Sequence, residues 1–131
     1  MKKLFLSLLF SASFTLCFGQ SASLSDIKKQ LQGTWLAHGD SISEVVITQD
    51  SITTFRFRIG GVTRCSYQLA SQPCEKLVKF PAATGVYITE KYATKTLCCA
   101  LAEVKAGSLI IIYPDGTQVA YVNEATMKKQ Q

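Results

Sequence analysis

The chain has 131 residues, of which 47% are hydrophobic and 18% are charged, and its formal net charge is +5. This length suits a single domain. The basic residues are spread along the chain without the basic stripe and interleaved aromatic residues of a nucleic-acid-binding protein, so we expect no nucleic-acid partner.

Residues 1–19 have the three-part layout of a secretory signal peptide. Lys2 and Lys3 form a positive start, and an apolar stretch follows over residues 4–18. Serines interrupt this stretch, which is too short to be a convincing membrane span, so we predict none. We therefore expect an exported product, periplasmic or secreted.

The sequence around the expected cleavage site favours a soluble product over a lipid-anchored one. Small residues precede the bond after Gly19, which is the predicted cleavage site, and cleavage after Ala22 is the alternative. A lipoprotein signal would need a small residue before the modified cysteine, whereas Leu16 precedes Cys17. Removal of the leader leaves 112 residues with a net charge of about +3.

A short helix is predicted over residues 23–31, where apolar residues recur at spacings of three and four. Ser23 and Asp26 fit a capping box, and Gly33 can end the helix. Two turns of helix are unstable alone, so the apolar face must pack on another element.

From Gly33 onward the hydrophobic period changes to two, which indicates strands. After a first strand from Gly33, the predicted strands are 44–48, 53–59, 63–69, 74–80, 86–92, 95–104, 108–113 and 117–122. In the clearest of them, 53–59, we expect Phe55 and Phe57 to point inward and Arg56 to point outward.

Eight or nine short strands joined by brief turns predict an all-β fold. Because no second helix of useful length is predicted, the sheet should be antiparallel. An up-and-down meander with this many strands can remove its edges by closing into a small barrel. We therefore predict a barrel domain over 23–123, with a two-sheet sandwich as the alternative, and a frayed polar tail over 124–131.

Four cysteines remain after the leader, which in an exported small domain predicts a disulfide framework. Their spacing contains no C-x-x-C pair, so a zinc site is not expected. A bridge between the adjacent Cys98 and Cys99 would be strained in an extended segment. We therefore expect Cys98 and Cys99 each to pair with either Cys65 or Cys74.

The segment Leu31-Gln32-Gly33-Thr34-Trp35, followed by a meander of strands, resembles the lipocalin-like proteins of bacterial envelopes. This resemblance implies that Trp35 closes the base of a barrel under the entering helix and that the mouth binds small apolar molecules. The last strand ends Tyr121-Val122-Asn123, without the basic residue that lipocalins usually carry late in the barrel. A META-type envelope domain opens with a similar Leu-x-Gly-Thr-Trp pattern.

Residues with catalytic potential have simpler interpretations. The run 38–41, His-Gly-Asp-Ser, has the composition of a turn, and adjacent side chains cannot form a triad. Strict alternation places Glu90 and Glu103 on inward faces, but we expect both to reach water at strand ends. We therefore predict neither an enzyme nor a cofactor.

The leading hypothesis is a protein that binds a small apolar ligand inside the barrel. The predicted ligand-binding residues are Trp35, Phe55, Phe57, Tyr67 and Tyr121. The alternative is a protein-interaction module or inhibitor that uses an outer face carrying Arg56, Arg58 and Arg64. The sequence leaves the oligomeric state open.

Overall fold

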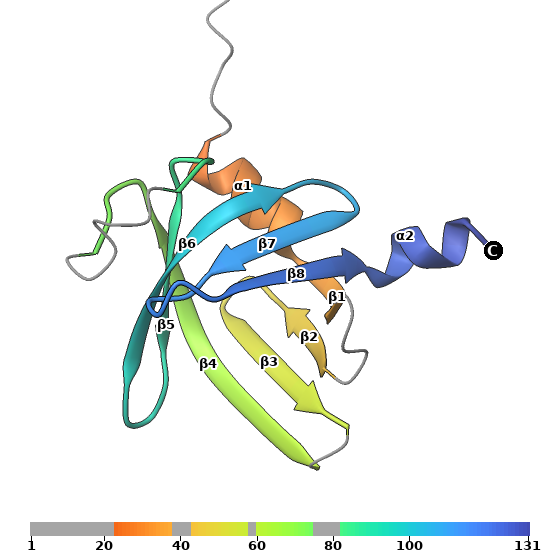
Figure 1. Ribbon diagram of the computed structural model, residues 1–131, viewed down its shortest axis with the longest axis horizontal. Helices are drawn as coiled ribbons and strands as arrows, with labels where there is room; N and C mark the ends of the chain where they lie inside the picture. The colour runs from red at the N-terminus through yellow and green to blue at the C-terminus, as the bar shows by residue number, and fades with distance from the viewer. Residues whose placement is uncertain (1–22, 38–42, 58–59, 75–81) are drawn as a thin grey trace, which may run out of the picture.

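The computed structural model describes residues 23–37, 43–57, 60–74 and 82–131. Within them the chain forms eight strands and two short helices (Figure 1). In chain order these are α1 Leu24–Leu31, β1 Gly33–Ala37, β2 Ser43–Ile47, β3 Ser51–Arg56, β4 Gly61–Ala70, β5 Tyr87–Lys91, β6 Thr96–Val104, β7 Ser108–Ile112, β8 Gln118–Asn123 and α2 Glu124–Lys129. Most of the strand predicted over 74–80 lies outside the described residues.

The strands form a closed up-and-down barrel, which confirms the predicted fold. Each strand pairs antiparallel with the next, and β1 pairs with β8 to complete the ring. Closure is possible because consecutive strands are joined locally and no crossover interrupts their order. The alternative of two packed sheets is wrong.

Helix α1 covers one end of the barrel, opposite the β3–β4 and β5–β6 turns (Figure 1). Ser23 caps the helix as expected, because the Asp26 amide donates to Ser23 Oγ at 3.2 Å. The Asp26 carboxylate accepts from Ser23 Oγ at 2.8 Å, in place of the backbone N–H that a capping box uses. Ile27 and Leu31 bury the apolar face of the helix in the barrel core.

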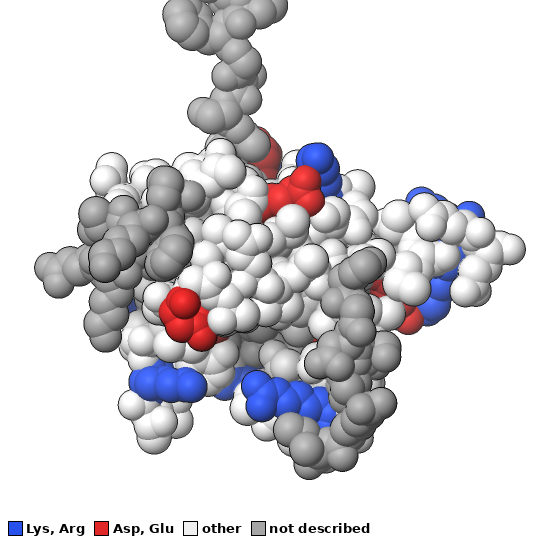
Figure 2. All heavy atoms as spheres, in the orientation of Figure 1, with Lys and Arg blue, Asp and Glu red and all other residues white. Residues whose placement is uncertain are grey.

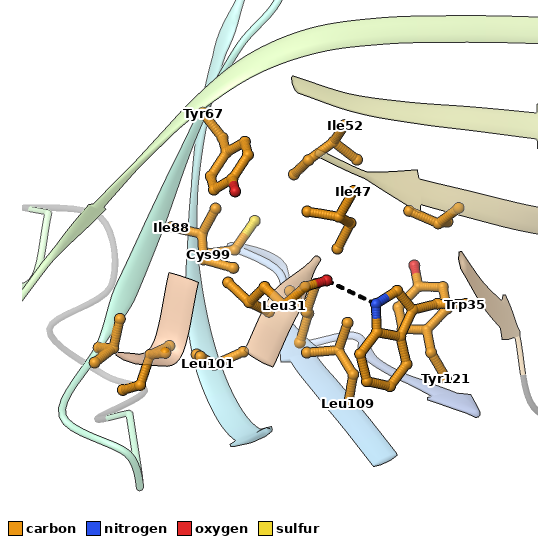
Figure 3. Packing of buried hydrophobic residues seen from close by; sticks show 14 of the residues in the cluster. Leu31, Trp35, Ile47, Ile52, Tyr67, Ile88, Cys99, Leu101, Leu109 and Tyr121 are labelled. Atoms are coloured by element: carbon orange, nitrogen blue, oxygen red, sulfur yellow. Dashed lines mark hydrogen bonds between the residues drawn. The ribbon is translucent and has the colours of Figure 1, made fainter. Parts of the chain in front are cut away.

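Trp35 joins the helix to the barrel wall. Its side chain is fully buried, and its indole N–H donates to the Leu31 carbonyl at 2.8 Å (Figure 3). That hydrogen bond occupies a carbonyl in the last turn of α1, which has no partner within the helix. Trp35 therefore fixes the helix over this end of the barrel, as the resemblance implied for it.

The inward face of β3 is the opposite of the one predicted. Ile52 is buried and pairs with buried residues of β2 and β4, so the even-numbered residues of β3 point into the barrel. Phe55 and Phe57 consequently point outward, and Phe57 is 65% exposed. Alternation alone has two possible phases; the aromatic residues suggested one, and packing around Ile52 selects the other.

A bulge in β6 changes the orientation of Glu103. Register shifts between Leu101 and Glu103, so Leu101 points inward while Glu103 lies on the outer wall. Glu103 there accepts from Ser108 Oγ and pairs with Lys105 Nζ at 2.9 Å. Strict alternation places Glu103 inside, but the extra residue of the bulge turns it outward, and the expectation that its carboxylate reaches water is confirmed.

Residues 124–129 form helix α2, in a segment where we expected a frayed tail. The Asn123 side chain caps it by accepting from the Ala125 amide at 2.9 Å, and Lys128 pairs with Glu124 one turn apart. None of its residues is buried, and the helix projects away from the barrel (Figure 1).

Candidate functional site

The end of the barrel opposite α1 contains an open cavity of about 560 Å³. All eight strands contribute to its wall, either directly or through the residue next to the strand end. The residues that line it are Ala37, Ser43, Thr54, Arg56, Thr63, Tyr92, Lys95, Leu97, Tyr113, Gln118, Val119, Ala120 and Tyr121. We call this space the mouth cavity; its volume falls within the usual range for small-molecule sites.

Strand register brings the polar side chains of the mouth cavity together. Arg56 at the end of β3 pairs with Ser43 at the start of β2, and Thr54 pairs with Thr63 of β4. These four residues share the inward phase that Ile52 sets further along β3. The sequence did not determine which face of β3 turns inward. The face that does so carries Arg56, and this is why a guanidinium lines the cavity.

Two cations, Arg56 and Lys95, lie at the mouth cavity, and no carboxylate is among the described residues that line it. Lys95 Nζ lies 5.4 Å from the centroid of the Tyr92 ring, a cation–π contact that holds the ammonium group near the opening. The local charge of the described wall is thus positive, which favours an anionic group in the cavity.

Three tyrosines supply hydroxyl groups to the same space. Burial raises the pKa of Tyr113, with the neighbouring Tyr121 as a further cause, and burial also raises the pKa of Tyr121. For Tyr92, burial and the hydrogen bond to Glu90 both raise the pKa. All three therefore remain neutral at physiological pH. The Tyr92 hydroxyl proton is already donated to Glu90, so a ligand could receive a hydrogen bond only from the Tyr113 and Tyr121 pair.

Glu90 is a buried carboxyl group behind the Tyr92 wall. It is 3% exposed, and the Tyr92 hydroxyl donates to its Oε2 at 2.8 Å. Burial raises the pKa of Glu90, although the Tyr92 hydrogen bond and Lys95 oppose this. Alternation placed Glu90 on the inward face of its strand. The expectation that its carboxylate reaches water at a strand end is wrong, because β5 continues past Glu90 to Lys91.

Glu90→Gln should flatten the pH dependence of stability. Because the folded-state pKa is raised, the unfolded chain loses its proton first as pH rises, so the native state loses stability between the ordinary and the raised pKa. Relative to the unmodified protein, the variant should be more stable at pH 8 than at pH 4, because glutamine has no proton to lose. Urea unfolding at pH 4, 6 and 8 measures this.

The matched control is Glu103→Gln. Hydrogen bonds from Ser108 and Lys105 lower the pKa of Glu103, so that group loses its stabilising effect only as pH falls. The control should therefore retain the decline in stability above the ordinary pKa of Glu90. A Glu90→Gln variant with the same decline would show that Glu90 is not its source.

The structure brings only some of the predicted ligand-binding residues to the cavity. Tyr121 lines it, whereas Trp35 lies at the closed end of the barrel. Tyr67 points into the barrel core (Figure 3), but its hydroxyl donates to the Thr48 carbonyl at 2.7 Å and does not reach the cavity. Phe55 and Phe57 are on the outer wall, so they do not line the cavity.

The predicted ligand-binding residues did not include the two cations and two of the three tyrosines that line the cavity. Arg56 was assigned to the outer face through the wrong phase of β3. Tyr92, Lys95 and Tyr113 lie just outside strands, in the positions that join them. The feature of the sequence that could have found these last three residues was the antiparallel meander, because it brings the β5–β6 and β7–β8 turns to the same end of the barrel.

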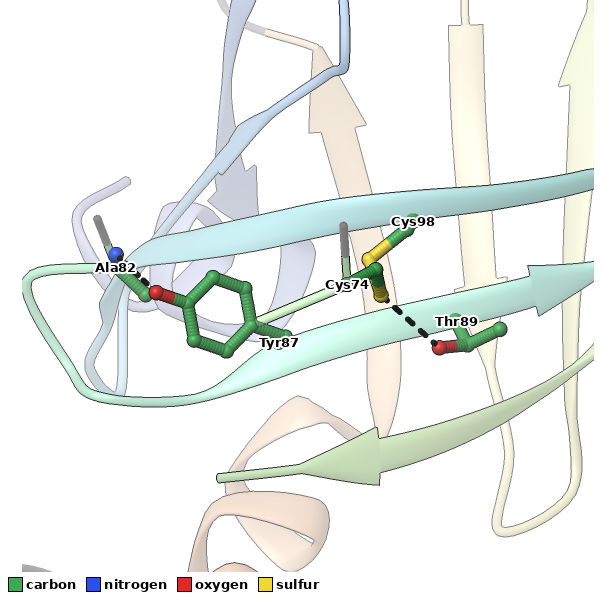
Figure 4. The surroundings of a disulfide bond; sticks show 5 residues. All are labelled: Cys74, Ala82, Tyr87, Thr89 and Cys98. Carbon is green, nitrogen blue, oxygen red and sulfur yellow. Dashed lines mark hydrogen bonds between the residues drawn. A yellow bond between two sulfur atoms is a disulfide. The ribbon is translucent and has the colours of Figure 1, made fainter. Parts of the chain in front are cut away.

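The four cysteines of the described residues form one bridge. Cys74 is bonded to Cys98 on the outer wall, beside Thr89 (Figure 4). Cys65 and Cys99 are buried free thiols, so the prediction that all four cysteines are bridged is wrong.

Register explains why the second bridge is absent. Cys99 of β6 pairs with Ile88 of β5. Ser66 of β4 pairs with Lys91, so the preceding residue, Cys65, lies opposite the position that follows Lys91. This offset of about 13 Å along β5 is too great for a disulfide. Burial raises the pKa of both thiols, which keeps them protonated and unreactive.

In the described part of the chain, no group of three or more His, Cys, Asp or Glu side chains could hold a metal ion. None of the described helices has the length and apolar character needed to cross a membrane. Residues 38–41, with the single histidine, and Arg58 lie outside the described residues.

No protein-family model, curated protein or solved structure matches this chain. The candidate function therefore depends on the mouth cavity and on the chemistry of its wall.

Proposed function

We propose that this protein is a lipocalin-like binding protein that holds a small amphipathic anion in the mouth cavity. The observation that carries the proposal is an open cavity of about 560 Å³ at one end of a closed barrel whose other end is sealed by α1. The sealed base and the open mouth leave a space that is accessible from one end only, which is the arrangement that small barrels use to hold one ligand.

The wall chemistry refines the apolar ligand expected from the sequence. Leu97, Val119 and the rings of the tyrosines offer apolar contact, whereas Arg56 and Lys95 add positive charge. A carboxylate, sulfonate or phosphate group near these cations would form charge-assisted hydrogen bonds. The apolar part of the ligand would then contact the rings of Tyr113 and Tyr121.

A binding role fits the buried carboxyl group better than a catalytic one. Glu90 is hydrogen-bonded to Tyr92 and does not itself line the cavity, so no described carboxylate can reach a ligand there. We also propose that the protein acts outside the cytoplasm, since the leader pattern of residues 1–19 and the Cys74–Cys98 bridge both suit an oxidising compartment.

The alternative hypothesis, an interaction face that carries Arg56, Arg58 and Arg64, now has less support. Arg56 lines the cavity, which leaves Arg64 as the exposed outward arginine among the described members of that set. We therefore favour ligand binding over recognition of an acidic protein by this face.

Displacement of a fluorescent anionic probe, 1-anilinonaphthalene-8-sulfonate, tests the proposal. Straight-chain C8–C12 carboxylates should displace the probe at about tenfold lower concentration than alcohols of the same length, because only the carboxylates can pair with Arg56 and Lys95. Arg56→Gln should weaken carboxylate binding by about tenfold and leave alcohol binding nearly unchanged.

Arg64→Gln is the matched control, since it removes one arginine from the outer wall of the adjacent strand. It should bind carboxylates as the unmodified protein does. Equal affinity for carboxylates and alcohols, or an equal loss in the Arg64 and Arg56 variants, would contradict an anion site at the mouth cavity.

A further inference from the structure

The outer wall beside the mouth carries an apolar patch that the ligand site does not use. Phe55 of β3 pairs with Val62 of β4, and Phe57 lies just past the end of β3. Phe57 is 65% exposed and Val62 is 63% exposed, although both are large hydrophobic residues. We call Phe55, Phe57 and Val62 the hairpin patch; it lies on the β3–β4 hairpin at the open end of the barrel (Figure 1).

Basic residues lie beside the hairpin patch and elsewhere at the same end of the barrel. Arg64 follows Val62 on the outer face of β4, Arg56 ends β3, and Lys91 and Lys95 lie at the adjoining β5–β6 turn. All four side chains are exposed. Figure 2 shows Lys and Arg side chains gathered along the lower edge of the molecule, where Figure 1 places these two hairpins.

Among the described residues, fewer acidic side chains lie near this end. Glu44 pairs with Phe55 from the β2 side, and Asp115 lies in the β7–β8 turn, where its carboxylate accepts from the Thr117 amide. The described residues at this end therefore have an excess of positive charge next to exposed apolar side chains. That combination complements an anionic lipid surface, which offers both negative head groups and an apolar interior.

The size of the hairpin patch argues against a second copy of the chain as its occupant. Its two exposed side chains offer on the order of 200 Å² of apolar surface. A stable protein–protein interface needs about 800 Å² on each partner. Insertion of a hairpin tip into a lipid interface has no such requirement, because each apolar side chain enters the lipid individually.

We propose that the β3–β4 hairpin docks the open end of the barrel on an anionic lipid surface, with Phe57 and Val62 entering the lipid and Arg64 contacting head groups. The mouth cavity would then open toward the membrane. This docking does not depend on the proposed ligand, since Phe57, Val62 and Arg64 do not line the cavity, although Arg56 and Lys95 of the cavity add to the positive charge of this end.

Sedimentation with vesicles tests the docking. The full chain is produced with its own N-terminal segment and recovered from the exported fraction, so that every variant has the same N-terminus. It should bind vesicles of phosphatidylethanolamine and phosphatidylglycerol more tightly than vesicles of phosphatidylcholine. Phe57→Ser should weaken binding to the anionic vesicles by about tenfold or more, and Arg64→Gln by about fivefold.

Leu24→Ser is the matched control, because Leu24 is an exposed apolar residue on α1 at the opposite end. It should bind as the unmodified protein does. In Phe57→Trp, the new indole should shift its emission to shorter wavelength on anionic vesicles and be quenched by brominated acyl chains. Trp35 is fully buried, so its emission should stay constant.

Several outcomes would overturn the docking. These are no binding to anionic vesicles, equal binding to both vesicle types, an equal loss in the Leu24 and Phe57 variants, and unquenched emission from Phe57→Trp. Size-exclusion chromatography that finds a dimer dependent on Phe57, without vesicle binding, would assign the hairpin patch to a second copy of the chain.

Discussion

Replacing Trp35 with alanine should lower the free energy of unfolding by about 3–5 kcal/mol, the largest loss that we expect from a single substitution. The indole is fully buried between α1 and the barrel wall. Its removal leaves a cavity under the helix and deprives the Leu31 carbonyl of its hydrogen bond. Equilibrium unfolding in urea, followed by circular dichroism, measures the loss.

Two further variants separate the contributions of Trp35. Trp35→Phe retains an aromatic ring but removes the N–H donor, so we expect a smaller loss of about 1–3 kcal/mol. Phe57→Ala truncates an aromatic residue that is mostly exposed and should change the free energy of unfolding by no more than about 0.5 kcal/mol. Equal effects at Trp35 and Phe57 would show that Trp35 does not seal the barrel.

Removing the Cys74–Cys98 bridge should cost about 3–4 kcal/mol. The bond joins residues 24 apart in sequence, and in the chain-entropy account a loop of that size restricts the unfolded chain by this amount. The bridge also ties the segment after β4 to the outer face of β6 (Figure 4). The double variant Cys74→Ser/Cys98→Ser, compared with the oxidised protein in urea, gives the value.

Reduction is the control for the bridge. Dithiothreitol should destabilise the unmodified protein by a similar amount and leave the double variant unchanged. Iodoacetamide should label no cysteine of the native protein within residues 65–99 and two after unfolding, because Cys65 and Cys99 are buried thiols. Peptide mapping that finds Cys65 linked to Cys99 would contradict this pairing.

The architecture was predictable because its signals are local and repeated. Alternating hydrophobicity, short turns and the lack of a second long helix are sufficient to predict an antiparallel meander. Capping by Ser23 was equally local, and the structure confirms it. Closure followed because a meander of this many strands removes its edges by joining its first strand to its last.

The candidate site was less predictable because it depends on which face of each strand turns inward. Strand β3 alternates perfectly in either phase, and the choice between Phe55 and Arg56 is made by the partners of Ile52 on neighbouring strands. At Glu103 the bulge changes the phase within one strand. Disulfide pairing likewise depends on register between strands, which spacing along the chain does not encode.

The joining of β1 to β8 also limits how other molecules can attach to this protein. In the described residues, the ring leaves little of the sheet edge unpaired. The exception is residues 61–65 of β4, which pair with β3 but not with β5. An extended peptide or an unfolded copy of the chain therefore finds only a short row of backbone amides and carbonyls to extend. Elsewhere on the described wall, association must occur through side chains. The topology thus limits fibre-like stacking, even with hydrophobic residues on the exterior of the barrel.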